Sequence, residues 1–236
     1  MRLGIMQPYF FPYIGYFSLI RHTDRYILLD QVQFIRHGWI ERNRILKQSG
    51  GWGYIAVPLK KHARETLISD IIIDNSKPWK EKIFSQLGYY KGAPNYYKVI
   101  KLMKEILGPD FESIVRLDCA ALEAVCDYLA IHTPIEIFSD MALDIGCPDS
   151  ADEWALRICQ SLGADEYWNP PGGMAFFDCR KYVENHVNIY FQKVNLSEYR
   201  QKQKVFEPGL SILDALMFLT VDEINEMLDD YELERV

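Results

Sequence analysis

Short runs of apolar residues alternate with polar turns in the first part of the chain. Residues 3–6 are apolar over the length of a buried strand, and Gln7-Pro8 ends the run because a residue before proline does not readily enter a helix. Pro12 can open a helix, since its missing N–H would be unpaired in a first turn. A second apolar run, residues 26–29, ends at Asp30. Strand, turn, helix and strand in this order predict the start of a parallel α/β sheet.

The next segment has the pattern of a hairpin followed by a buried strand. Residues 33–46 are polar and rich in arginine, which suits an extended segment that enters a hairpin. Ser49-Gly50-Gly51 marks a turn, and the apolar and aromatic residues 52–59 return from it. Residues 67–73 are nearly continuous in isoleucine, as expected for a strand that is covered on both faces.

The remainder of the chain alternates helical and strand patterns. Apolar stripes predict helices that begin near Ser76 and that cover residues 96–107 and 111–131. Capping boxes at Ser150 with Glu153 and at Thr220 with Glu223 predict two more helix starts, the second that of a terminal helix. Strands are expected at residues 134–138, 166–168 and 187–191. We therefore expect one α/β domain over residues 1–236, with a Rossmann-like parallel sheet and a helical C-terminal portion.

Composition and charge narrow the class of function. The 236 residues are 49% hydrophobic and 25% charged, which is ordinary for a globular protein. A formal net charge of −7 argues against nucleic-acid binding, which favours clustered lysine and arginine. No apolar run approaches the roughly 20 residues that span a bilayer, and the N-terminus has no signal-peptide pattern. These features predict a cytoplasmic protein without a membrane span.

Cysteine and histidine indicate neither a disulfide framework nor a metal site. The five cysteines stand singly along the sequence, as reduced thiols of a cytoplasmic protein would. The histidines have no metal-ligand spacing, so we expect no bound metal. Cys147 and Cys179 are conceivable thioester-forming nucleophiles, but no histidine stands near either of them in the sequence to activate it.

Polar residues follow the first two predicted strands. Parallel sheets bind ligands beyond the carboxyl ends of their strands, where Gln7 and Asp30 would both lie. Asp30 could hold an amine or act as a base, and Arg42 could clamp a carboxylate or phosphate with its planar guanidinium. We expect a site of mixed acidic and basic character where Gln7, Asp30 and Arg42 converge. The alternative is that Asp30 pairs with Arg42 and that Trp39 belongs to the core. The candidates after the second strand are Asp30, Gln33, Trp39, Arg42 and Asn43.

Later segments add further candidates. Gly172 and Gly173 could approach a substrate closely, with Asp178 bonding a hydroxyl or amine, although a tight turn uses the same residues. Ser211 and Asp214 stand three residues apart, and we interpret them as a helix start that docks on the core. His37 has no positioned carboxylate beside it and gives little support for acid–base catalysis.

Three motifs resemble those of a known family. The run QPYFFPYIGYF, the segment DQVQF and the motif GWIERNRI are similar to the WbqC-like proteins found with bacterial surface-polysaccharide genes. The similarity continues in looser form to residues 206–216 and so covers nearly the whole chain. The resemblance implies transfer of glycine, or of a related acyl group, to O-antigen sugars.

A more distant similarity concerns the fold. Nucleotidylyltransferases of the pantothenate-synthetase type place His-x-Gly-His at the start of the helix after the first strand, where this chain has Tyr13-Ile14-Gly15-Tyr16. The resemblance implies a nucleotidyltransferase-type sheet in which Gly15 lets the helix start lie close to a phosphate. Tyrosine cannot supply the cationic imidazole of those enzymes, so adenylyl transfer is not expected.

The resulting hypothesis is an acyl or aminoacyl transferase that acts on a sugar intermediate. Asp30 would orient or deprotonate the acceptor, while Arg42 and Asn43 would hold a phosphate or carboxylate. The substrates would be an activated amino acid or acyl donor and a sugar acceptor, with a carrier protein or a second copy of the chain as conceivable partners. No cofactor follows from the motifs. The donor pocket would be lined by Gln7, Tyr13 and Tyr16.

Two alternatives belong to other classes. One is a nucleotide-binding module that has lost catalysis and serves as a partner in a biosynthetic complex. The other is an ATP-dependent ligase, which would need a basic residue close to the phosphates. His37 or Arg42 could fill that need only by folding back toward the phosphates.

Overall fold

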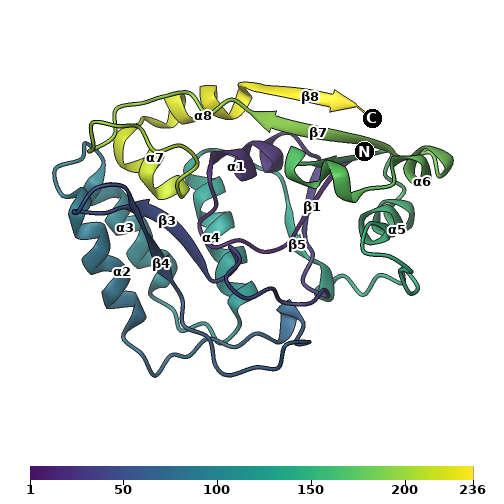
Figure 1. Ribbon diagram of the computed structural model, residues 1–236, viewed down its shortest axis with the longest axis horizontal. Helices are drawn as coiled ribbons and strands as arrows, with labels where there is room; N and C mark the ends of the chain where they lie inside the picture. Colours follow the sequence, from purple (N-terminus) through teal and green to yellow (C-terminus); the bar gives the residue numbers. More distant parts are fainter. Residues whose placement is uncertain (236) are drawn as a thin grey trace.

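The computed structural model describes residues 1–235 and places six strands in one central sheet (Figure 1). Neighbouring strands are parallel except for the last pair, which is antiparallel. The predicted α/β class, with a Rossmann-like and mostly parallel sheet, is therefore confirmed. In spatial order the strands are β5 (Ile135–Ile137), β2 (Arg25–Leu28), β1 (Arg2–Met6), β6 (Glu166–Asn169), β7 (Asn188–Val194) and β8 (Tyr231–Arg235).

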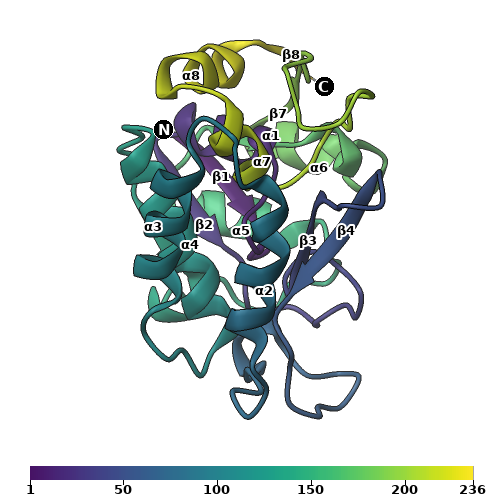
Figure 2. The same cartoon turned by 90° about the vertical axis from the view of Figure 1, so that its left-hand side faces the viewer.

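Helices lie on both sides of this sheet. Figures 1 and 2 show α5 (Glu153–Leu162) and α6 (Cys179–Glu184) on one side and α2 (Trp79–Leu87), α3 (Tyr96–Leu107) and α4 (Ile114–Tyr128) on the other. No helix within residues 1–235 is long and apolar enough to cross a membrane. The remaining helices are α1 (Ile14–Arg21), α7 (Ile212–Phe218) and α8 (Val221–Asp229).

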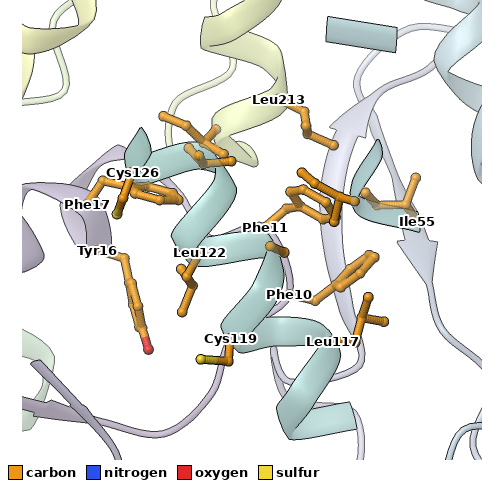
Figure 3. Close-up of a cluster of buried hydrophobic side chains, with 14 of the residues drawn as sticks. Phe10, Phe11, Tyr16, Phe17, Ile55, Leu117, Cys119, Leu122, Cys126 and Leu213 are labelled. Carbon is orange, nitrogen blue, oxygen red and sulfur yellow. The ribbon is translucent and has the colours of Figure 1, made fainter. Parts of the chain in front are cut away.

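Alternation along the strands divides the buried side chains into two cores. On β2, Ile27 belongs to the core under α5 and α6, while Tyr26 and Leu28 face the larger core on the opposite side. Figure 3 shows part of the larger core, where Phe10 and Phe11 pack among side chains of α4, the hairpin and α7. The loop after β1 is thus anchored by its own aromatic residues.

A separate hairpin carries the arginine-rich segment. Strands β3 (Arg42–Leu46) and β4 (Trp52–Ala56) pair antiparallel, with Leu46 opposite Trp52. Gly50 and Gly51 adopt positive φ angles of 90° and 63° in the turn, which glycine tolerates without steric cost. The predicted hairpin is confirmed.

The isoleucine-rich segment does not form the predicted strand. Residues Ile68–Asp70 form a 3₁₀ turn, and the flanking residues Leu67, Ile72 and Ile73 make only isolated bridges. Ile68, Ile71 and Ile73 are nonetheless fully buried. The continuous apolar run therefore predicts the burial of these residues, but burial alone does not determine how the backbone pairs.

Two further local expectations differ from the structure. Asp152 rather than Ser150 is the N-cap of α5, and the Ser150 hydroxyl donates to the Asp152 carboxylate at 2.5 Å. The last element within residues 1–235 is also not the predicted helix, because β8 follows α8 and pairs with β7 along the sheet edge. The capping box that starts α8 at Thr220 and Glu223 is confirmed.

The strand order creates one topological switch point. From β1 the chain moves outward through β2 to β5, and then returns to the opposite side of β1 at β6. The connections that leave β1 and β6 therefore diverge. In sheets of this kind, the crevice between such strands at their carboxyl ends is where ligands bind.

Candidate functional site

A pocket of about 710 Å³ lies at this switch point. It is lined by residues that follow β1, by residues that end or follow β6, by the loop of residues 29–40, and by the start of α5. Its volume is within the range of roughly 300–1,000 Å³ that is usual for small-molecule sites. This cavity lies at the carboxyl edge of the sheet, where the sequence places the candidate site.

The lining of the pocket is aromatic, aliphatic and uncharged. Among the described residues it contains seven aromatic side chains and three amide side chains, but no Lys, Arg, His, Asp or Glu. This differs from the expected mixture of acidic and basic groups. The amides are those of Gln7, Gln33 and Asn169, and the aromatic residues are Tyr9, Tyr16, Trp39, Trp154, Tyr167, Phe176 and Phe177.

Gln7 and Asn169 are the polar groups best placed to meet a ligand. Gln7 directly follows β1, and Asn169 is the last residue of the adjacent strand β6. Asn169 is only 6% exposed, yet neither side-chain amide hydrogen-bonds to another group in residues 1–235. The polar atoms of both amides are open to the cavity, so both amides can donate to and accept from a ligand in the pocket.

Two tyrosines hold the strand ends that carry these amides. The Tyr16 hydroxyl donates to the carbonyl of Gln7 at 2.8 Å, and the Tyr167 hydroxyl donates to the carbonyl of Ile5 at 3.3 Å. Both side chains are buried, and burial raises the pKa of both phenols, so they stay neutral hydrogen-bond donors. Figure 3 shows the Tyr16 hydroxyl pointing away from the labelled phenylalanines of the large core.

Trp39 joins the pocket wall to the loop after β1. Its ring stacks on Tyr9 with 5.7 Å between centroids, and its carbonyl accepts from the N–H of Phe10 at 3.0 Å. The Arg44 guanidinium lies 5.5 Å from the centre of the same indole, within the range of a cation–π contact. Trp39 is 41% exposed, so the alternative that it belongs to the core is not supported.

The loop after β1 is fixed by a group of hydrogen bonds at Phe11 and Pro12. Phe11 has a positive φ of 43°, which is unusual for a residue with a bulky side chain. Its carbonyl accepts from the Asn43 amide and from the Ser211 hydroxyl at 2.8 Å. The carbonyl of Pro12 accepts from the N–H of Ile212 at 2.8 Å. Three sequence motifs far apart in the chain therefore meet here and hold the wall of the pocket.

Asn43 is consequently placed as a structural tie. It is fully buried, its amide nitrogen donates to Phe11, and its oxygen accepts from the N–H of Arg44 at 2.7 Å. Ser211 caps α7, and the buried Asp214 accepts from Tyr90, Tyr199 and Gln201. The interpretation of this segment as a docked helix start is confirmed.

Asp30 and Arg42 lie outside the pocket lining. The Asp30 carboxylate is buried and accepts from the N–H and the hydroxyl of Ser139 at 3.0 and 2.6 Å, tying the end of β2 to the end of β5. Burial raises the pKa of Asp30. Arg42 donates to the carbonyls of His37 and Gly38, and its guanidinium lies 4.2 Å from the centre of the Tyr54 ring. Gln7, Asp30 and Arg42 are therefore not brought together around one cavity.

The helix start after β1 also differs from a phosphate-binding turn. A Cβ added to Gly15 would come within 2.5 Å of the Tyr13 ring, so the tyrosine fills the space beside this glycine. Neither Tyr13 nor Gly15 lines the pocket, whereas Tyr16 does. The resemblance of the sheet to that of nucleotidyltransferases stays a prediction. In the structure, Gly15 makes room for the ring of Tyr13.

The segment after β6 supplies the opposite wall. Gly172 and Gly173 both line the pocket, and a Cβ on Gly173 would meet the Asn169 amide at 2.5 Å. Gly173 thus leaves room for Asn169. Asp178 instead caps α6 by accepting from the N–H of Arg180 at 3.2 Å.

Several lining residues were not singled out from the sequence. Asn169 is a polar residue at the end of a predicted strand, which is the same signal that identified Gln7. Tyr9 lies within the QPYFFPYIGYF motif. Trp154, Tyr167, Phe176 and Phe177 gave no signal, because an aromatic residue in a helix, a strand or a loop is most often part of the core.

Comparisons with known proteins identify a family and a relative of this chain, and neither carries the name of an activity. The model of the WbqC-like protein family matches residues 7–226. The protein Rv1507c of Mycobacterium tuberculosis (strain ATCC 25618 / H37Rv), named as uncharacterized, is 30% identical over 219 residues, which cover 91% of this chain and 92% of the relative. No solved structure matches the chain.

Proposed function

The chain belongs to the WbqC-like protein family, and from this premise we propose that it transfers an acyl or aminoacyl group, such as glycyl, to a sugar intermediate of surface-polysaccharide synthesis. The observation that carries the proposal is the pair of amides at Gln7 and Asn169, which have no partner in the described chain and line an aromatic pocket. In this proposal Asp30 and Arg42 do not contact the substrate. They hold the loops near the pocket, Asp30 through Ser139 and Arg42 through the carbonyls of residues 37–38.

The chemistry of the lining suits a sugar ring. Sugar hydroxyls both donate and accept hydrogen bonds, as the amides of Gln7 and Asn169 do. Aromatic side chains such as Trp39 and Phe176 provide apolar surface for the C–H faces of the ring. A phosphate or carboxylate inside the pocket would find no cation among the lining residues. Anionic parts of either substrate therefore stay outside the cavity.

The absence of a nucleophile or base among the described lining residues favours direct transfer. The sugar nitrogen or oxygen would form a bond to the acyl carbon, and the bond between acyl carbon and leaving group would break. The leaving group would take the electron pair, and the proton of the attacking atom would pass to solvent at the mouth. An amine needs no base to attack an activated acyl donor, so an amino sugar is the preferred acceptor. Catalysis would then come from orientation.

The same absence favours a second candidate. A pocket without titratable groups also suits a module that binds a sugar or nucleotide and delivers it to a partner enzyme. The two candidates differ in one outcome, because only the transferase yields an acylated sugar.

The test is surface-polysaccharide composition in a deletion strain complemented with variants. Gln7→Met keeps the size of the side chain but removes the amide, and should lower sugar acylation by about tenfold, the effect of losing one hydrogen bond of roughly 1.4 kcal/mol. Gln48→Met, at an exposed position, is the matched control and should leave acylation unchanged. Full acylation by Gln7→Met would refute the transferase site. Sugar binding without acylation by the purified wild type, given thioester and acyl-phosphate donors, would select the delivery module.

A further inference from the structure

One segment of this acidic protein is strongly basic. Residues 33–66 contain seven Lys or Arg residues and two acidic residues, Glu41 and Glu65, which gives the segment a net charge of +5 in a chain whose net charge is −7. The rest of the chain is correspondingly acidic. Such a concentration of one sign is a local feature that the net charge of the whole chain conceals.

Part of this segment is attached directly to the wall of the pocket. Gln33 and Ile35 line the cavity. The Gln33 amide donates to the carbonyl of Arg64 at 2.9 Å, and the guanidinium of Arg36 donates to the carbonyl of His62 at 3.1 Å. The loop of residues 60–66 therefore runs beside residues 33–36. We call Arg36, Lys60, Lys61 and Arg64 the basic rim.

The cations of the basic rim have no carboxylate partner. All four residues are exposed, and within residues 1–235 none of them forms an ion pair. Elsewhere in the same molecule cations are matched, as Arg25 is with Glu136 and Arg116 with Asp140. Cations that form no ion pair within the protein are open to pair with a bound anion.

We propose that the basic rim binds the phosphates of a glycosyl diphosphate whose sugar enters the uncharged pocket. This inference rests on the proposed function and names its substrate class. A sugar diphosphate has a neutral ring at one end and charged phosphates next to it. The neutral cavity matches the ring, and the cationic rim beside it matches the phosphates. Arginine binds phosphate through two parallel hydrogen bonds, and lysine adds point charges. A nucleoside diphosphate sugar and a lipid-linked diphosphate sugar share this chemistry.

Calorimetric titration with four probes tests the assignment. The probes are inorganic pyrophosphate, UDP-N-acetylglucosamine, farnesyl-diphosphate-linked N-acetylglucosamine and free N-acetylglucosamine. The rim variant is Lys60→Gln, Lys61→Gln and Arg64→Gln together, and the matched control is Lys98→Gln, Lys101→Gln and Lys104→Gln on α3. We expect the rim variant to weaken pyrophosphate and UDP-N-acetylglucosamine by at least about tenfold, with no change for the free sugar. We expect higher salt to weaken the wild-type affinity for both anions.

The outcomes separate the two levels of the inference. Equal affinities of the wild type and the rim variant for pyrophosphate, or no binding of pyrophosphate by the wild type, would overturn the basic rim. Rim-dependent binding of pyrophosphate without any sugar binding would keep the rim and reject the proposed pocket ligand. A farnesyl-diphosphate-linked sugar that binds more tightly than UDP-N-acetylglucosamine in a rim-dependent way would identify the lipid-linked source, and the reverse order would identify the nucleotide sugar.

Discussion

At the scale of single residues, the most informative group is the carbonyl of Phe11. It is shared by the Asn43 amide and the Ser211 hydroxyl, which come from the hairpin and from α7. A left-handed backbone at a buried phenylalanine persists only where its surroundings determine it. Phe11, Asn43 and Ser211 therefore shape the pocket from behind and do not need to touch the ligand.

Replacing Asn43 tests this interpretation. Asn43→Ala leaves the N–H of Arg44 without its side-chain acceptor and removes one donor from Phe11, so the free energy of unfolding should fall by about 1–3 kcal/mol. Gln48→Ala, at an exposed position, should change it by less than about 0.5 kcal/mol. Chemical denaturation measures both. A stable Asn43→Ala protein that loses only ligand affinity would instead support a substrate-binding role.

Asp118 predicts a dependence of stability on pH. It is fully buried on α4, and neither carboxylate oxygen has a hydrogen-bond partner within residues 1–235. Burial, with a smaller effect of the charge of Glu41, raises its pKa well above the usual value. The folded state therefore holds a proton that the unfolded state releases, so this carboxyl lowers stability increasingly as pH rises above the unfolded pKa. Asp118→Asn should stabilise the protein more at about pH 7.5 than at about pH 4.5.

Thermal unfolding of the wild type and Asp118→Asn at both pH values measures the difference. A change in Tm that is the same at the two pH values would mean that Asp118 is ionised in the folded protein and has a partner.

Some sequence candidates line the pocket and others do not. The candidates that line it are Gln7, Tyr16, Gln33, Trp39, Gly172 and Gly173. Asp30 and Arg42 are candidates in the sequence because charged side chains are chemically versatile. Their true contacts, with Ser139 and with the carbonyls of the loop at residues 37–38, depend on segments whose approach no local pattern encodes.

At the scale of elements, the start of α1 shows how packing can replace an anion site. The aromatic ring of Tyr13 lies where a Cβ on Gly15 would be, so the small residue accommodates a side chain of its own chain. Gly15 does indicate a close approach, as the sequence predicts, but the group that approaches it is the ring of Tyr13 and not a phosphate.

A double-mutant cycle examines this contact. Gly15→Ala alone should lower the free energy of unfolding by about 1–3 kcal/mol, because the new methyl group collides with the Tyr13 ring. In a Tyr13→Ala background the same change should be neutral or stabilising by up to about 1 kcal/mol, because alanine favours a helix over glycine. Urea denaturation of the four proteins gives the coupling energy. Simple additivity of the two changes would contradict the contact.

Elements with a periodic pattern were predicted well, and those that depend on a distant partner were not. The apolar stripe of α3 and the capping box of α8 depend only on residues that are close together in the sequence. The β8 strand exists because β7 offers it an edge, and residues 67–73 fail to form a strand because no neighbouring strand lies along their whole length. Pairing of this kind is a tertiary property.

At the scale of the whole molecule, the order β5-β2-β1-β6-β7-β8 decides where chemistry can occur. The switch between β1 and β6 opens the crevice, the two strand ends deliver Gln7 and Asn169 to it, and the loops around it supply aromatic walls on one side and the basic rim beside them. Fold and charge distribution therefore both support the proposed ligand, a neutral ring with an anionic extension.

The most direct measurement is magnetic resonance of the two side-chain amides. In isotope-labelled protein, the signals of Gln7 and Asn169 can be assigned through the variants Gln7→Met and Asn169→Leu, and then followed during titration with a panel of free and phosphate-linked amino sugars. We predict that at least one sugar shifts both signals together and to saturation, while the exposed amides of Gln48 and Asn185 stay unchanged. Binding of a sugar that leaves both pocket amides unmoved, or failure of every sugar to bind, would contradict the proposal that this pocket holds a sugar ring.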